Sequence, residues 1–213
     1  SIASPFFTVY MLRNLGFSYV TFMAVIISQT LFNLLTIRLW GKFADKYGNY
    51  EVIKITSILI PLYPILWLIS KRPLFLILGP ALIGGIAFAG FNLATANFIF
   101  DSVKPEKRGL AVSYYNVLAG IGIFLGAGLG AILVKFLTIT FMDKLLFIFL
   151  ISAFARMSVS LIIMPSLKEI RKTEKFDSKR AIKNLEKRLI PSIFGGFHGL
   201  ILKKTHVHHL HRK

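Results

Sequence analysis

The stretch Trp40-Gly41-Lys42-Phe43-Ala44-Asp45-Lys46-Tyr47-Gly48 decides the fold, because it joins two apolar runs that are each long enough to cross a bilayer. It is short and charged, and a glycine lies near each end. Gly41 would allow a neighbouring helix to approach closely, and Gly48 would allow a tight turn. The stretch therefore predicts a charged turn between two antiparallel membrane helices.

The composition of the chain agrees with a membrane protein. The hydrophobic share is 55%, the mean hydropathy is +0.67, and only 16% of the residues are charged. Soluble domains carry roughly a quarter charged residues, so long apolar segments explain this composition better than a large soluble core. The chain has no cysteine, which excludes disulfides, thiolate chemistry and cysteine metal sites.

Apolar runs predict a short first helix and five full membrane spans, since about 20 residues are needed to cross a bilayer. The predicted helices cover residues 1–12, 18–40, 52–70, 74–101, 109–135 and 145–164. Their short connections require neighbouring helices to be antiparallel. We therefore expect an all-α polytopic transmembrane bundle over residues 1–164. The chain begins with Ser and its first run is short, so we expect the start to be a cut through a larger protein.

Residues 165–213 form a second, basic region with 13 of the 26 Lys and Arg residues and a net charge of +9. Apolar residues recur at helical spacing over 178–190, which predicts an amphipathic helix at the membrane surface. Of all Lys and Arg residues, 20 fall on the face that holds this tail and five on the other face. The positive-inside rule then places residues 40–52, residues 102–108 and the tail in the cytoplasm. Such a distribution suits anionic lipid better than nucleic acid, so no nucleic-acid binding is expected.

The opening stretch resembles the G-x-x-x-D-[RK]-x-G motif in the short cytoplasmic loops of major facilitator superfamily transporters. The residues that match the motif are Gly41, Asp45, Lys46 and Gly48. The basic pair that usually follows the second glycine is absent, since Asn49 and Tyr50 stand there. In the family this loop latches the cytoplasmic gate, and the resemblance implies the same role for the matching residues.

A second predicted turn, Pro105-Glu106-Lys107-Arg108-Gly109, resembles the P-x-x-R-[GA] turn that the family often has at this position. Arg108 is the candidate for a gate salt bridge with Asp45 or Glu106. The alternative is that Arg108 contacts a lipid phosphate.

The order of elements resembles the C-terminal six-helix half of such a transporter, over about residues 1–170. The resemblance implies a secondary active transporter or facilitator that moves a small solute by alternating access in the plasma membrane. It also implies a partner, either the missing N-terminal half or a second copy of this chain. The alternative function is a non-transporting membrane scaffold or assembly factor that kept the fold.

Polar side chains inside the predicted helices are candidates for the substrate cavity, because they are costly in a bilayer unless they face a cavity or a partner. Gln29 and Asn33 are spaced i,i+4 and share one helix face. The alternative for each residue is a hydrogen bond between helices without contact to the solute. The candidate set is Tyr10, Gln29, Asn33, Asn92, Asn97, Tyr115 and Asn116.

Charged residues within the predicted helices are few. No acidic residue lies near the middle of a helix, so we expect any proton coupling to rest on another part of the carrier, unless the carrier is a uniporter. Arg156 is the only charge clearly inside a helix. It either has a structural role, snorkels towards the interface, or binds substrate.

Two patterns that suggest a ligand are weaker than they look. Gly120-Ile121-Gly122 lies within an apolar run without a preceding strand, so it predicts a packing surface rather than a dinucleotide loop. A terminal histidine cluster either binds zinc weakly or is a solvated tail; its members are His206, His208, His209 and His211. We predict no metal site, no cofactor and no enzymatic activity, since no nucleophile and base occur together.

Overall fold

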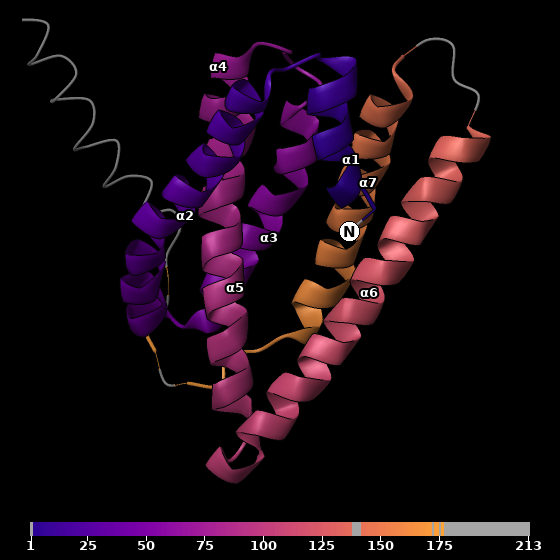
Figure 1. Cartoon of the computed structure of the whole chain (residues 1–213). Helices are drawn as coiled ribbons and strands as arrows, with labels where there is room; N and C mark the ends of the chain where they lie inside the picture. The colour runs from indigo at the N-terminus through magenta and orange to yellow at the C-terminus, as the bar shows by residue number, and fades with distance from the viewer. Residues whose placement is uncertain (1, 138–141, 172, 175, 177–213) are drawn as a thin grey trace, which may run out of the picture. The chain divides into compact units, whose positions relative to one another are not determined.

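The computed structural model describes residues 2–137, 142–171, 173–174 and 176, and over these residues it is helical without strands (Figure 1). The all-α prediction is confirmed. The elements are α1 (Ser4–Val9), η1 (Tyr10–Asn14), α2 (Tyr19–Tyr47), α3 (Asn49–Leu66), α4 (Pro73–Leu76), η2 (Ile77–Ala81), α5 (Leu82–Ser102), η3 (Pro105–Lys107), α6 (Arg108–Phe136), α7 (Lys144–Ile163) and η4 (Met164–Ser166).

Two π-helical turns join neighbouring helices into longer rods. η1 continues α1, and η2 connects α4 to α5, with Pro80 inside η2. The described residues therefore form six helical rods in the predicted order. The compact unit that holds them extends to Glu174. The predicted tail helix and the histidine cluster lie outside the described residues.

Four of the described helical segments are long and apolar enough to cross a membrane: Tyr19–Tyr47, Pro73–Ser102, Pro105–Phe136 and Lys144–Ser166. The rod of α1 and η1 is short. α3 has 18 residues, and its first turn contains Asn49 and Glu51, so it is less apolar than the span predicted over 52–70. The helix therefore begins at the polar residue Asn49, three residues before the predicted start at residue 52.

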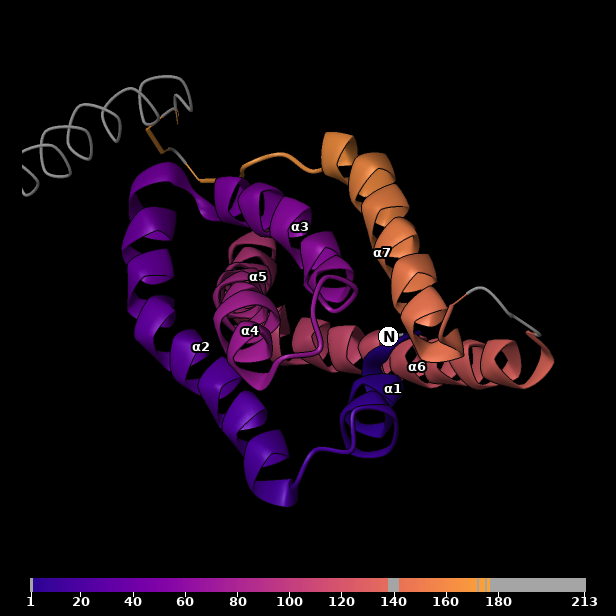
Figure 2. The ribbon, with the colours of Figure 1, turned by 90° about the horizontal axis from the view of Figure 1, so that it is seen from above.

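α5 packs mainly against α2 and α3, and α3 also packs against α7. Figure 2 shows α5 between α2 and α3. Small residues on α5 make this close approach possible, because a Cβ at Gly85 would overlap the backbone of α2, and one at Gly90 would overlap Trp40. Trp40 Nε1 also donates a hydrogen bond of 2.8 Å to the carbonyl oxygen of Ile86.

The long helices α2 and α6 bury few side chains. Only Val25 and Ala44 are buried in α2, and only Gly130 is buried in α6. Large exposed apolar residues lie on both helices, including Leu35 and Phe124. These faces suit lipid or a second bundle rather than water.

Two clusters hold α3 at its two ends. The aromatic cluster, around Trp67 directly after α3, consists of Phe7, Tyr10, Tyr63, Trp67 and Phe149, whose ring centroids lie 4.3–6.3 Å apart in the paired contacts. The turn cluster, near the start of α3, consists of Ala44, Val52, Ile53 and Ala94. The start of α3 therefore packs in the small turn cluster, and its end packs in the larger aromatic cluster.

The loop predicted over residues 40–52 is wrong, because this segment is almost entirely helical. α2 continues through Tyr47, α3 begins at Asn49, and Gly48 alone separates them. The helix continues beyond the apolar run because Ala44 is buried in the turn cluster and Trp40 and Phe43 pack against it. One packed face is enough to extend a helix into polar sequence.

Candidate functional site

The centre of the candidate site is Gly48, which is buried and has φ +94°. Its N–H donates a hydrogen bond of 2.8 Å to the carbonyl oxygen of Ala44 and so closes α2. Side chains with a Cβ rarely adopt this backbone conformation. The second glycine of the motif is therefore required by the turn itself.

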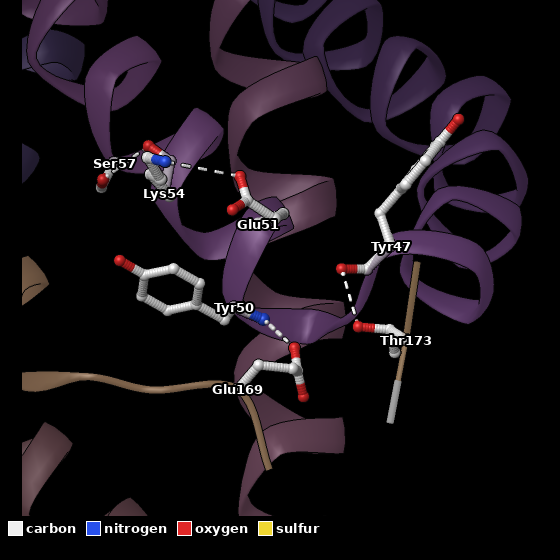
Figure 3. A network of polar contacts seen from close by, with 7 residues as sticks. All are labelled: Tyr47, Tyr50, Glu51, Lys54, Ser57, Glu169 and Thr173. Atoms are coloured by element: carbon white, nitrogen blue, oxygen red, sulfur yellow. Dashed lines mark hydrogen bonds and ion pairs between the residues drawn. The ribbon is translucent and has the colours of Figure 1, made fainter. Parts of the chain in front are cut away.

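A segment from the end of the described chain lies across this turn. We call residues 167–171 and 173–174 the strap. Glu169 Oε2 accepts a hydrogen bond of 2.8 Å from the N–H of Tyr50 in the first turn of α3 (Figure 3). Its Oε1 accepts from the N–H groups of Ile170 and Arg171 at 3.0 and 3.1 Å. Three backbone donors thus surround one carboxylate.

The strap also contacts the last turn of α2. Thr173 Oγ1 donates to the carbonyl oxygen of Tyr47 at 3.4 Å, as Figure 3 shows. The N–H of Glu174 donates to the carbonyl oxygen of Lys46 at 3.2 Å. An exposed ion pair of 3.6 Å joins Lys46 Nζ to the Glu174 carboxylate. The strap therefore bonds to both helices that meet at Gly48.

The first residue of α3 ties the turn to α5. Asn49 is fully buried, and its Nδ2 donates a hydrogen bond of 2.8 Å to Asp101 Oδ2 in the last turn of α5. Asn49 Oδ1 has no hydrogen-bond partner within the described residues. The residue that stands after the second glycine of the motif thus makes a directed contact between helices.

The predicted gate residues on the α2–α3 segment differ in their exposure. Asp45 and Lys46 are exposed, and within the described ranges Asp45 makes no hydrogen bond or ion pair. Gly41 faces Leu93, which would lie 3.9 Å from an added Cβ. The glycines are therefore packed within the bundle, whereas Asp45 is available to another surface and Lys46 makes the exposed ion pair with Glu174.

Arg108 does not form the predicted salt bridge with Asp45 or Glu106 in the part of the chain that the structure describes. Its Nε donates to the carbonyl oxygen of Phe100 at 3.2 Å, and its guanidinium lies 5.8 Å from the centre of the Phe100 ring. The carbonyl belongs to the end of α5, where helical carbonyl groups lack partners. Arg108 caps α5 in this arrangement.

The cavity candidates on α2 lie against α5. Gln29 and Asn33 are half-buried; the Gln29 side-chain amide lies beside Gly84, and backbone atoms of both residues lie beside Gly85. Their side chains make no hydrogen bond to any other described residue. The i,i+4 prediction of a shared helix face agrees with this placement.

The other candidates are spread over several surfaces. Tyr10 lies in the aromatic cluster with 1% of its surface exposed, and its hydroxyl has no partner among the described residues. On α5, Asn92 is exposed and Asn97 is half-buried. On α6, Tyr115 and Asn116 are exposed. The structure does not bring the seven candidates together into one site.

Arg156 turns towards the bundle interior. Its Nε donates to Ser152 Oγ at 3.2 Å, and its guanidinium lies 5.9 Å from the centre of the Phe88 ring. Ser152 is on the same helix and is buried. These contacts favour the structural alternative over substrate binding, since an aromatic face and a hydroxyl already stabilise the cation.

Sequence reasoning missed Glu169 and the Asn49–Asp101 pair. Glu169 lies 119 positions from its partner Tyr50, and Asn49 lies 52 positions from Asp101. The available signal was local: α3 follows a glycine and so has no capping side chain of its own. That signal shows that a cap is missing, but it does not identify the residue that supplies it.

Comparison with known families gives a match over most of the chain. The family model of the Major Facilitator Superfamily matches residues 1–202, a range that includes every residue described above. The search of curated proteins finds no match.

Proposed function

This chain belongs to the Major Facilitator Superfamily, and from that premise we propose that it moves a small solute across the membrane by alternating access. The family and the apolar helices make it an integral membrane transporter of the major facilitator kind. The proposal adds the mechanism, either secondary active transport or facilitated passage.

The observation that carries the proposal is the placement of Gln29 and Asn33. Both residues lie within the apolar span of α2 and are half-buried. The Gln29 amide nitrogen lies beside Gly84 of α5, and the Asn33 backbone packs against Gly85. An amide without a hydrogen-bond partner costs free energy in an apolar medium. The bundle supplies no partner to these two side chains over its described residues, so the interhelical alternative is not favoured. A polar solute, water or a second bundle would satisfy them.

We propose that the chain acts as the C-terminal half of the carrier. The order of the helices, which resembles that half, supports this assignment. The basic residues support a cytoplasmic position for the α2–α3 turn, because Lys and Arg concentrate on cytoplasmic faces. The partner would be the N-terminal half or a second copy of this chain. Support for a second bundle comes from the sparse burial of α2 and α6.

The motif residues would act at the interface with that second bundle. Asp45 and Lys46 are exposed on a turn whose backbone is well bonded. An exposed carboxylate can accept from donors at a helix N-terminus of another bundle in one state of the cycle and lose them in the other. Arg108 would move between its α5 carbonyl and a carboxylate.

The test is uptake into liposomes by the complete carrier, screened against a panel of solutes. We expect Asn33→Ala to lower uptake of the transported solute roughly tenfold, since one hydrogen bond to a solute is worth about 1.4 kcal/mol. Asp45→Ala should lower uptake at normal expression. Leu34→Ala, at an exposed apolar position beside Asn33, is the matched control. A folded protein that moves no solute would favour the scaffold alternative.

A further inference from the structure

We propose that Glu169 is a positioning residue for the α2–α3 turn, and that the strap is a latch whose release frees this turn. The consequence for transport rests on the proposed function, but the latch itself does not. The turn carries Asp45 and Lys46, so any change in the turn changes how these two charges are presented.

The first argument is that α3 lacks a cap of its own. The first N–H groups of a helix have no partner within the helix, and a side-chain oxygen at the preceding residue usually accepts from one of them. Gly48 has no such side chain. Glu169 Oε2 accepts instead from Tyr50, the second residue of α3. A carboxylate at this end is also favoured by the helix dipole.

The second argument is steric. An added Cβ at Gly48 would overlap the Glu169 carboxyl group, with the Cδ atom only 2.6 Å away. Gly48 is thus required for two independent reasons, its positive φ and the space that Glu169 occupies. The carboxylate lies directly against the backbone of the turn.

The third argument is that the same strap completes the other helix. The last carbonyl groups of α2 have no partner within the helix. Thr173 supplies a donor to Tyr47, and the N–H of Glu174 supplies one to Lys46. One short segment therefore satisfies donors of α3 and acceptors of α2, and it bridges the single residue between them.

The strap can open without unfolding a helix. Its apolar anchor is small, since among strap residues only Leu167 packs against the turn cluster, together with Met164 of η4. α7 ends at Ile163, and Leu167 already has an extended backbone. Segments with few buried contacts and exposed hydrogen bonds open at low free-energy cost. Glu169 supplies one of the three hydrogen bonds that join the strap to the turn, the one from Tyr50. Its bonds from Ile170 and Arg171 lie within the strap and orient the carboxylate.

The experiment is hydrogen exchange at single-residue resolution on the full chain in lipid nanodiscs. Glu169→Gln leaves one neutral acceptor oxygen where the carboxylate had two charged ones, so the hydrogen bond from the Tyr50 N–H is either lost or loses its charge assistance. We expect the Tyr50 amide to exchange at least roughly tenfold faster, as for the loss of one charge-assisted hydrogen bond. Amides in the middle of α3, around Thr56, should keep their rates.

Two variants control the measurement. Glu174→Gln removes only the exposed ion pair with Lys46 and leaves the backbone donor of the strap, so Tyr50 exchange should not change. Glu169→Asp keeps the charge on a shorter side chain and should restore part of the protection. A rise confined to Tyr50 and its neighbours supports the latch.

Either of two results would overturn the proposal: unchanged Tyr50 exchange in Glu169→Gln, or an equal rise along all of α3, which would indicate general destabilisation. As a second readout, the absence of native cysteine allows spin labels at Lys42→Cys and Lys168→Cys. Their distance distribution should widen when Glu169→Gln is added, and an unchanged distribution would count against the latch. Neither readout requires transport, so a failed uptake assay would remove the carrier proposal without deciding this one.

Discussion

The two ends of α3 are held by different physical means. At the Trp67 end, the aromatic cluster packs five rings from α1, η1, α3 and α7 and leaves the Tyr10 hydroxyl without a partner among the described residues. At the Gly48 end, the turn cluster buries smaller apolar residues, and Asn49 and Tyr50 both make directed hydrogen bonds to distant carboxylates. Packing is strong and hard to reverse, whereas the hydrogen bond from Tyr50 to the half-buried Glu169 can exchange with water. We therefore expect the aromatic end of α3 to stay rigid and the α2–α3 turn to change its conformation more easily.

The largest expected effect is at the aromatic end. Phe149→Ala should lower the stability of the bundle by about 3 kcal/mol, because a fully buried ring leaves a cavity. That cost corresponds to a drop in melting temperature of about 6–12 °C. Thermal unfolding in detergent micelles measures it. Phe154→Ala, on the same helix but 67% exposed, is the control and should change the melting temperature little. Equal effects in the two variants would contradict the packing role of this cluster.

The next effect separates strain from contact at the turn. Gly48→Ala should cost about 3 kcal/mol, from a positive φ and from displacement of Glu169. Gly16 has φ +64° and nothing within 4 Å of an added Cβ. Gly16→Ala should therefore cost only the strain, about 1 kcal/mol. Gly48 also has the more restrictive backbone, with φ +94° and ψ 160°, so the difference between the two melting temperatures is an upper bound on the contribution of the strap. No difference would mean that the strap yields freely.

Asn49→Ala should cost about 1–3 kcal/mol, because Asp101 would lose its buried donor at the end of α5. Asn92→Ala is the comparison on an exposed amide of α5 and should leave stability nearly unchanged. Chemical denaturation in micelles can rank the two variants. If Asn49→Ala proved as mild as Asn92→Ala, the turn would not depend on its link to α5.

The smallest effect is expected from the ion pair between Lys46 and Glu174. Both side chains are more than half exposed, so solvent screens the attraction. Glu174→Gln should leave the melting temperature unchanged within error, at low and at high salt. A clear salt-dependent loss of stability would show that the strap is held by charge rather than by its backbone hydrogen bonds.

Much of the fold could be predicted from local sequence. The six helical rods and their order follow from apolar runs and short polar breaks, since a chain in lipid must satisfy its backbone within each helix. Gly48 was recognised as a turn residue. The predicted end of α2 at Trp40 is too early, because the prediction used only the length of the apolar run. Packing of Ala44 in the turn cluster extends the helix by seven residues, to Tyr47.

The candidate site was only partly predictable. Gln29 and Asn33 share a face because helix periodicity alone decides that. Tyr10 looked like an isolated polar residue, and only the packed structure places it against the rings of Trp67 and Phe149. The proposed Arg108 pair also depended on distance in space, which sequence spacing does not supply.

The sequence by itself determined the membrane class, the helix order, the family motif and the requirement for glycine at position 48. These properties depend on composition, on periodicity within one helix and on one backbone conformation. The tertiary structure alone decided that Glu169 caps α3, that Asn49 meets Asp101, and that Asp45 stays exposed. The partners in these hydrogen bonds are separated by 52 positions in one case and by 119 in the other, so no periodic pattern in the sequence reveals them. Their geometry exists only after the helices have packed.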